Sequence, residues 1–195
     1  MLKRLFDILA SLIGIVILSP FLFLISILVL LDSRGGIFYK QVRVGEGMKE
    51  FKLFKFRTMY SNSDKKGLLT VGMKDNRITK IGYYLRKYKL DELPQLLNVL
   101  IGDMSIVGPR PEVPKYVAMY TNEQKKVLNI KPGITDYASI EYANENEILA
   151  KASNPEEEYI NTIMPAKLKL NLKYISEMGL GTDIGIIFRT IGKIF

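Results

Sequence analysis

The sequence contains neither cysteine nor histidine. Without cysteine, disulfide bonds, thiolate nucleophiles and cysteine-built zinc sites are excluded. Without histidine, acid–base and metal chemistry must depend on Asp, Glu, Lys, Arg or Tyr. Carboxylate oxygens favour a hard ion such as magnesium over zinc. A metal site in this chain is therefore expected to bind magnesium.

Acidic residues are fewer than basic ones, and the basic excess lies in the first half of the chain. The chain has 28 Lys and Arg against 20 Asp and Glu, a net charge of +8. Residues 1–100 carry 17 of the basic and 8 of the acidic residues. A positive field of this kind suits nucleic acid, anionic lipid or a phosphorylated substrate. No recognised nucleic-acid-binding motif is present, so lipid and phosphate are the expected partners.

A hydrophobic segment of 20 uncharged residues covers 12–31. As a straight helix it would be ~30 Å long, enough to cross the core of a bilayer. Ser19-Pro20 lies near its middle, where proline removes a backbone donor and the serine hydroxyl can satisfy a freed backbone group. Basic residues flank both ends, although a spanning helix should show a lopsided count. Crossing and re-entry through the same face both remain open on these features. The flanking residues are Lys3, Arg4, Arg34, Lys40 and Arg43.

The remaining chain predicts short strands and several helices. Alternating apolar residues and a glycine turn favour strands at 38–45 and 51–59. Helical spacing of apolar residues, or a proline with acids at a helix start, favours helices at 77–90, 93–100 and 112–129, and one starting at 155–158.

A last predicted helix, 183–195, has an apolar face with Arg189 and Lys193 on another. This pattern is typical of a helix in the membrane interface, although an ordinary core helix has it too. Because a membrane-embedded segment is expected at the N-terminus, we favour the interface. The apolar face comprises Ile184, Ile187, Phe188, Ile191 and Ile194.

Asp91 and Glu92 are adjacent carboxylates at a predicted helix start. An acid in this position is often only a helix cap. The same geometry favours the ionised carboxylate, which would keep Asp91 available as a nucleophile or metal ligand. Arg86 lies just upstream, with Lys87 and Lys89, and would add positive potential for a phosphorylated substrate.

Arg110 lies between two prolines, whose fixed backbone angles hold the arginine in place. Its guanidinium can bind phosphate oxygens through two parallel hydrogen bonds. A rigid surface turn would give the same Pro-Arg-Pro string. Lys55 and Arg57 are equally compatible with a solvated strand face, and Asp183 with a cap of the last helix. None of these residues indicates a function by itself.

In their order and spacing, these motifs resemble the bacterial sugar transferase family, the small monotopic phosphoglycosyl transferases. The most specific match is the 22-residue block LDELPQLLNVLIGDMSIVGPRP at 90–111. The other matches are Ser19-Pro20 within the apolar segment, FYKQVRVG (38–45), KFRTM (55–59), KPGIT (131–135) and Asp183.

The resemblance implies an α+β, mostly helical fold in two parts. Residues 1–34 would form a re-entrant membrane helix, broken at Ser19-Pro20. Residues 35–195 would form a small catalytic domain with short strands and interfacial amphipathic helices. The implied location is the cytoplasmic face of the bacterial inner membrane, as a monotopic protein.

The resemblance also implies a two-step transfer. Asp91 would attack the β-phosphate of a UDP-sugar, releasing UMP and forming a covalent phosphosugar–aspartyl enzyme, which undecaprenyl phosphate would then attack. Magnesium, held partly by Asp91, would neutralise the diphosphate. Glu92 would orient or deprotonate the lipid phosphate. Basic positions near the phosphates would be Lys55, Arg57, Arg86 and Arg110, and Asp183 matches an acid that the family requires. Other enzymes of glycan assembly are further candidate partners.

Two points stay open. The sequence departs from the family after Thr135, where Asp136-Tyr137 replaces a glycine and an aromatic residue, so the sugar is the least defined part. An N-acetylated hexosamine or a bacillosamine-type sugar is expected. The alternative function is a non-enzymatic, single-pass membrane scaffold with a basic cytoplasmic domain, which leaves the 90–111 block without a purpose.

Overall fold

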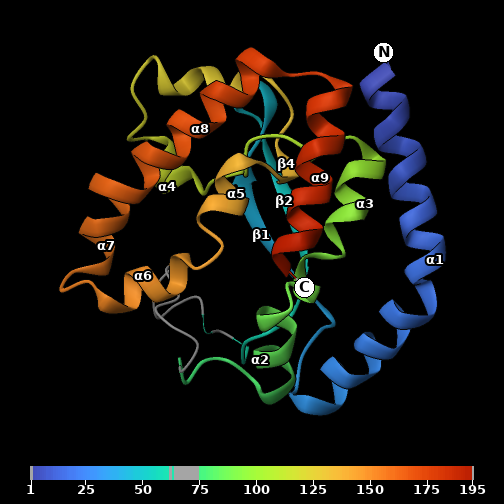
Figure 1. The fold of residues 1–195 in the computed structure, drawn as a ribbon. Helices are drawn as coiled ribbons and strands as arrows, with labels where there is room; N and C mark the ends of the chain where they lie inside the picture. The colour runs from blue at the N-terminus through green and yellow to red at the C-terminus, as the bar shows by residue number, and fades with distance from the viewer. Residues whose placement is uncertain (1, 62, 64–74, 195) are drawn as a thin grey trace.

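The computed structural model describes residues 2–61, 63 and 75–194. Within them the protein is mostly helical with short strands, as predicted for an α+β fold (Figure 1). The helices are α1 (Leu2–Asp32), α2 (Lys80–Lys87), α3 (Gln95–Ile101), α4 (Pro114–Val117), α5 (Tyr137–Glu141), α6 (Glu145–Lys151), α7 (Pro155–Glu158), α8 (Met164–Glu177) and α9 (Leu180–Ile194). The strands are β1 (Phe38–Val44), β2 (Glu50–Phe56), β3 (Ser105–Val107) and β4 (Gly133–Thr135). Short 3-10 segments are Glu46–Met48, Leu90–Glu92 and Gln124–Asn129, and a π-helical turn, Tyr159–Ile163, joins α7 to α8.

The first helix, α1, runs without interruption through Ser19-Pro20, and Pro20 lies inside it. Pro20 has no N–H to offer the carbonyl of Val16, four residues earlier. The Ser19 hydroxyl donates to that carbonyl instead, at 2.8 Å. The predicted break is therefore wrong as an interruption of the helix, although the ribbon of α1 changes direction about halfway along (Figure 1).

Both ends of α1 are attached to the rest of the chain. Near its start, the buried Asp7 accepts hydrogen bonds from the Ser105 hydroxyl and the Ile106 N–H, each at 3.0 Å. At its end, the Asp32 carboxylate accepts the N–H of Ile81 in α2, at 2.9 Å. Between these ends most apolar side chains of α1 are exposed, and the helix is long and apolar enough to cross a bilayer.

Four strands form two small sheets. The predicted strands 38–45 and 51–59 are confirmed as the antiparallel hairpin β1–β2, although β2 ends at Phe56. The second sheet, which the sequence did not predict, is the parallel pair β3–β4, with Ser105 opposite Gly133 and Val107 opposite Thr135.

The predicted helices 77–90 and 93–100 are confirmed as the shorter α2 and α3, and the start at 155 as α7. The predicted helix 112–129 is wrong, because the chain forms α4 and then a separate 3-10 segment. Thr121 and Gln124 begin the second segment with reciprocal side-chain-to-backbone hydrogen bonds, at 2.9 and 3.2 Å. Such a capping box starts a new helical turn.

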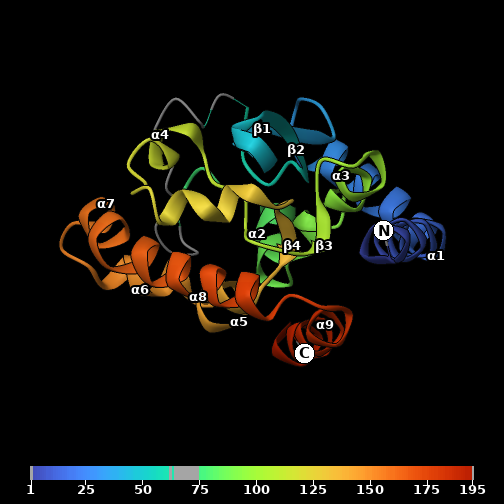
Figure 2. The same ribbon diagram turned by 90° about the horizontal axis from the view of Figure 1, so that it is seen from above.

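The last helix, α9, begins at Leu180, three residues before its predicted start. Its Ile186 is buried, whereas Ile184, Phe188 and Ile191 are exposed. Figure 2 shows α9 and the first half of α1 both viewed along their axes, on the same side of the molecule. The largest core lies away from them and joins β1, α4 and α8 through Val44, Val113, Tyr116, Val117, Tyr120, Val127, Leu128, Leu149, Tyr159, Ile163, Met164 and Leu168.

Candidate active site

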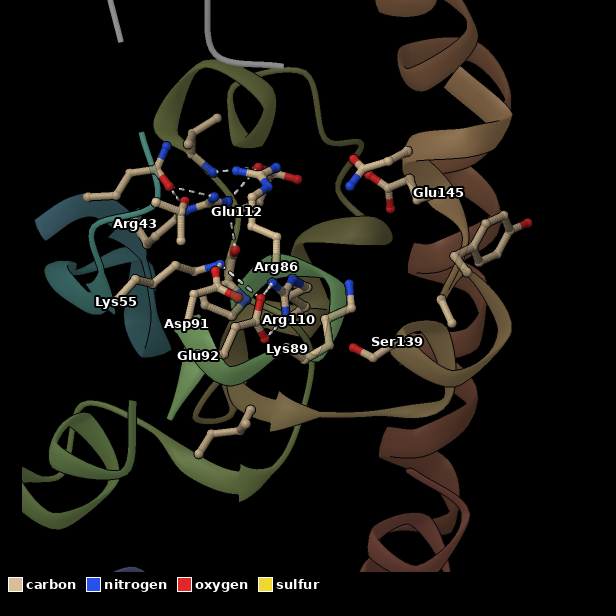
Figure 3. Close-up of a pocket in the computed structure, with 18 of the residues that line it drawn as sticks. Arg43, Lys55, Arg86, Lys89, Asp91, Glu92, Arg110, Glu112, Ser139 and Glu145 are labelled. Atoms are coloured by element: carbon tan, nitrogen blue, oxygen red, sulfur yellow. Dashed lines mark hydrogen bonds and ion pairs between the residues drawn. The ribbon is translucent and has the colours of Figure 1, made fainter. Parts of the chain in front are cut away.

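A cavity of about 640 Å³ lies between the β1–β2 hairpin, the turn before α3 and helices α5, α6 and α8. Figure 3 shows charged side chains gathered on one side of it, with Lys55, Asp91, Glu92 and Arg110 close together. The segments that carry them are far apart in the sequence. The fold therefore brings four of the predicted site residues to one place.

The local backbone presents the two carboxylates to the cavity. After α2 ends, Lys89 adopts a left-handed conformation, with φ 56°, and the 3-10 turn Leu90–Glu92 follows. Pro94 then precedes α3, so a helix begins after Asp91-Glu92 as predicted. Asp91 and Glu92 thus sit on a tight turn ahead of α3.

Asp91 is buried but its carboxylate accepts no hydrogen bond within the described part of the chain. The nearest cationic group is the ammonium of Lys55, 4.0 Å from Asp91 Oδ2. Burial raises the pKa of Asp91, and Lys55 only partly opposes this shift. The direction is opposite to the prediction that a helix N-terminus keeps this acid ionised, because desolvation outweighs the nearby positive charges.

Glu92 differs from Asp91 in its hydrogen bonds and in the direction of its pKa shift. Arg110 donates two parallel hydrogen bonds to its two carboxylate oxygens, one of them at 3.0 Å, and Lys55 donates a third at 2.8 Å. Burial alone would raise the pKa of Glu92, but Arg110 and Lys55 outweigh it and hold the pKa well below its usual range. A carboxylate of such low basicity is a poor general base, so the geometry favours the orienting role for Glu92.

Arg110 is fixed by its backbone as well as by Glu92. Its N–H donates to the buried carboxylate of Asp136, at 3.2 Å. The preceding Gly108 lies against β4 so closely that a Cβ on Gly133 would be 2.0 Å from the Gly108 nitrogen. The Pro-Arg-Pro segment is therefore part of a packed structure and is not merely a surface turn.

Two further cations complete the positive side of the cavity. Arg86, in the last turn of α2, and Lys89 both line it. Their charges favour ionised Asp91, although less strongly than Lys55 does. Arg86 therefore lies where the sequence predicted it, beside the carboxylate pair.

Arg57 has a different environment from the one predicted. Its guanidinium donates to backbone carbonyls at and just beyond the end of α1, including those of Val29, Ser33 and Gly36, at 3.2, 2.8 and 2.6 Å. The last carbonyls of a helix lack partners within it, which explains why a buried arginine is held there. Arg57 therefore attaches the end of α1, and because it also lines the cavity, its role in phosphate binding stays a prediction.

Asp183 is fully buried and does not line the cavity. It accepts hydrogen bonds from Lys3 in α1, at 2.5 Å, and from the Tyr174 hydroxyl in α8, at 2.7 Å. Burial and the Asp183 carboxylate raise the pKa of Tyr174. Asp183 thus joins α1, α8 and α9 instead of simply capping the last helix.

Sequence reasoning missed two acids with important positions. Asp7 attaches α1 to β3, and its signal was present, because it is the only acid before Asp32. Glu112 accepts hydrogen bonds from Arg43, at 3.0 Å, and from the Tyr159 hydroxyl at the edge of the cavity. Nothing in the sequence pairs Glu112 with residues so distant.

Among the described residues at this site, Asp91 is the candidate ligand for a magnesium ion. The described residues contain no group of three or more acidic side chains that could hold a metal. Arg110 and Lys55 bind Glu92, whereas the Asp91 carboxylate lines the cavity and accepts no hydrogen bond from the residues that the structure describes. Magnesium commonly binds through one or two carboxylates together with substrate phosphates and water. The residues present fit that arrangement, with Asp91 as the ligand.

The fold and the site together define a protein with cationic side chains gathered around a carboxylate pair and with a long, exposed apolar helix. The chain belongs to the bacterial sugar transferase family, whose sequence model matches residues 1–195. This finding confirms the resemblance that the motifs indicated.

Curated relatives share this similarity over nearly the whole chain. A UDP-N-acetylgalactosamine-undecaprenyl-phosphate N-acetylgalactosaminephosphotransferase of Aeromonas hydrophila is 35% identical over 196 residues, 99% of this chain and 43% of the relative. A UDP-glucose:undecaprenyl-phosphate glucose-1-phosphate transferase of Escherichia coli (strain K12) is 37% identical over 204 residues, 100% of this chain and 40% of the relative. The exopolysaccharide production protein PSS of Rhizobium leguminosarum bv. phaseoli is 35% identical over 206 residues, 97% of this chain and 93% of the relative. This chain therefore spans less than half the length of the first two.

Proposed function

We propose that this chain transfers a sugar-1-phosphate from a UDP-sugar to undecaprenyl phosphate, giving undecaprenyl diphosphate-sugar and UMP. The observation that carries this proposal is the contrast between the two adjacent acids. The Asp91 carboxylate lines the cavity without a hydrogen bond from the described residues, while Glu92 is occupied by Arg110 and Lys55. The names of the Aeromonas and Escherichia relatives support both substrates.

In the first step, an Asp91 oxygen attacks the β-phosphorus of the UDP-sugar. The bond from this phosphorus to the bridging oxygen breaks, and UMP leaves with that oxygen. The product is a mixed anhydride between Asp91 and the sugar phosphate. Lys55 and Arg110 lie where they can stabilise the negative charge on the transferred group.

In the second step, a phosphate oxygen of undecaprenyl phosphate attacks the same phosphorus. The bond to Asp91 breaks, and the free carboxylate is restored. Magnesium bound at Asp91 would neutralise the diphosphate, stabilise the leaving UMP and favour the ionised carboxylate. Two separate displacements allow the water-soluble donor product to leave before the lipid acceptor reacts.

Glu92 acts through its partners in this proposal. Its two oxygens hold the guanidinium of Arg110, and Lys55 donates to one of them at 2.8 Å. These contacts keep both cations next to Asp91 before a substrate binds. Preorganised charges of this kind need no rearrangement as the reaction proceeds. We therefore propose Glu92 as a positioning residue.

We further propose that α1 enters and leaves the membrane through its cytoplasmic face. Asp7, near the start of the helix, is attached to β3, and Asp32, at its end, to α2. A helix crossing the bilayer would hold these ends ~30 Å apart on opposite sides, so one attachment would be lost. In this proposal residues 1–34 are the membrane segment and residues 35–195 the catalytic domain. The exposed face of α9 lies in the interface beside α1.

Thiol labelling tests this topology, because the chain has no native cysteine. Leu2→Cys and Arg34→Cys, made separately, place a thiol at each end of α1. We expect a membrane-impermeant reagent to label neither variant in intact spheroplasts and both after permeabilisation. The single-pass scaffold requires one end to be labelled in intact cells, and that result would exclude re-entry.

The transfer itself is tested with purified protein in detergent or nanodiscs. We expect UMP to be released continuously only when a UDP-sugar, magnesium and undecaprenyl phosphate are all present, together with formation of the diphospholipid sugar. An N-acetylated donor is proposed as the preferred substrate. A protein that turns over no UDP-sugar under these conditions would contradict the proposed function.

A further inference from the structure

The lining of the cavity includes two polar groups that the proposed chemistry does not use. Ser139 in α5 and Asn171 in α8 both line the cavity. The Ser139 hydroxyl and Asn171 Oδ1 are buried and have no hydrogen-bond partner among the described residues. Asn171 as a whole is 4% exposed. Since buried polar atoms are nearly always paired, these two are candidates for pairing with a ligand.

Ser139 is held in a fixed relation to the phosphate-binding side. The buried Asp136 accepts the backbone N–H of Ser139 at 2.6 Å and the backbone N–H of Arg110 at 3.2 Å. One carboxylate therefore connects the start of α5 to the arginine that binds Glu92. In Figure 3, Ser139 lies across the site from Lys55 and Asp91, and its hydroxyl points towards the side of Arg110 and Lys89.

The two polar groups have complementary hydrogen-bonding capacities. Asn171 Oδ1 can only accept a hydrogen bond, whereas the Ser139 hydroxyl can donate one. Apolar side chains accompany both: Ala138 precedes Ser139, and Leu168 lies one helical turn before Asn171, and both also line the cavity. A ligand group with an N–H, a carbonyl oxygen and a methyl group would pair with both polar groups and cover the apolar side chains. An acetamido group has these three parts, whereas a hydroxyl leaves the apolar surface uncovered.

We propose that Ser139 and Asn171 bind the 2-acetamido group of an N-acetylhexosamine donor, with Asn171 accepting its N–H and Ser139 donating to its carbonyl. The inference rests on the proposed function and specifies its substrate class. The acetamido group is attached next to the anomeric carbon that carries the phosphate. It therefore lies close to the β-phosphate, on the side of the cavity that Asp136 connects to Arg110.

The test compares four donors with wild-type protein and three variants. UMP release is measured with UDP-N-acetylglucosamine, UDP-N-acetylgalactosamine, UDP-glucose and UDP-galactose, and inhibition by added UMP is measured alongside. The variants are Ser139→Ala, Asn171→Ala and, as a matched control, Asn161→Ala, whose side chain is exposed in the turn before α8. Thermal unfolding reports whether each variant still folds.

We expect the wild type to prefer an N-acetylated donor by about tenfold or more in kcat/KM, since unsatisfied buried groups penalise a donor without the amide. Ser139→Ala and Asn171→Ala should each raise KM for that donor by about tenfold, with inhibition by UMP and the Asn161→Ala control unchanged. A wild type that turns over UDP-hexoses equally well would overturn the proposal, as would variants with an unaltered KM. Equal weakening of UMP binding would assign the two residues to the nucleotide instead. No release from any donor would contradict the proposed function itself.

Discussion

Asp91→Asn is expected to abolish turnover, reducing kcat on the order of 10⁴-fold. Asparagine has nearly the same size as aspartate, but its amide cannot form the mixed anhydride with the sugar phosphate. It is also a poorer magnesium ligand than a carboxylate. Losses of this order are typical when the nucleophile of a covalent mechanism is removed. The measurement is steady-state UMP release with undecaprenyl phosphate present.

Asp103→Asn is the matched control, because Asp103 follows α3 and does not line the cavity. This variant should retain nearly full turnover. Thermal unfolding should show that both variants fold, since Asp91 accepts no hydrogen bond from the described residues whose loss would destabilise the protein. Turnover of Asp91→Asn at the wild-type rate would remove the basis of the proposed mechanism.

Arg110→Lys is expected to reduce kcat by about 10²-fold or more, although the positive charge is retained. Arginine makes two parallel hydrogen bonds to Glu92, and a lysine ammonium cannot reproduce that fork. The same planar group is the one suited to paired phosphate oxygens. Loss of one preorganised donor in an enzyme site typically costs about 10²–10³-fold. The kinetic constants for the UDP-sugar measure the effect.

Two comparisons separate geometry from charge at this position. Arg189→Lys, a matched change at an exposed position of α9, should leave turnover unchanged. Glu92→Gln should reduce kcat less than Arg110→Lys does, because it loosens Arg110 without removing it. If Arg110→Lys were fully active, the bidentate contact would have no part in the reaction.

The candidate-site residues that the fold brings together were predicted from local signals or from the family resemblance. Asp91 and Glu92 precede a helix, and proline and apolar spacing at 94–100 are enough to predict that helix. Lys55 and Arg110 lie 37 and 18 residues from Glu92 in the chain, so no local pattern predicts their contacts with it. Only the resemblance brought these residues together before the fold was known.

The failures have physical causes that a linear pattern does not reveal. Strands β3 and β4 have three residues each, too few for alternation to be recognised, and they depend on the close approach of Gly108 and Gly133. The family resemblance placed Arg57 near the phosphates, but no linear pattern predicts its hydrogen bonds to the carbonyls at the end of α1.

At Ser19-Pro20 the sequence predicted the loss of a backbone donor, but it did not predict that the helix continues. The proline removes one backbone donor, as predicted, but the neighbouring hydroxyl replaces it at 2.8 Å from the Val16 carbonyl. With that carbonyl satisfied, the helix continues from Leu2 to Asp32. A proline therefore lies inside this helix without ending it.

Intact-protein mass spectrometry in the absence of lipid acceptor is the most direct test of a phosphosugar carried on this chain. Purified protein is mixed with magnesium and the UDP-sugar that it turns over, and the reaction is stopped within seconds. The account predicts one UMP released per protein molecule and a mass increase of one sugar phosphate, located at Asp91 by peptide mapping and removed by adding undecaprenyl phosphate. An unmodified protein, with UMP appearing only when donor and lipid are present together, would contradict it.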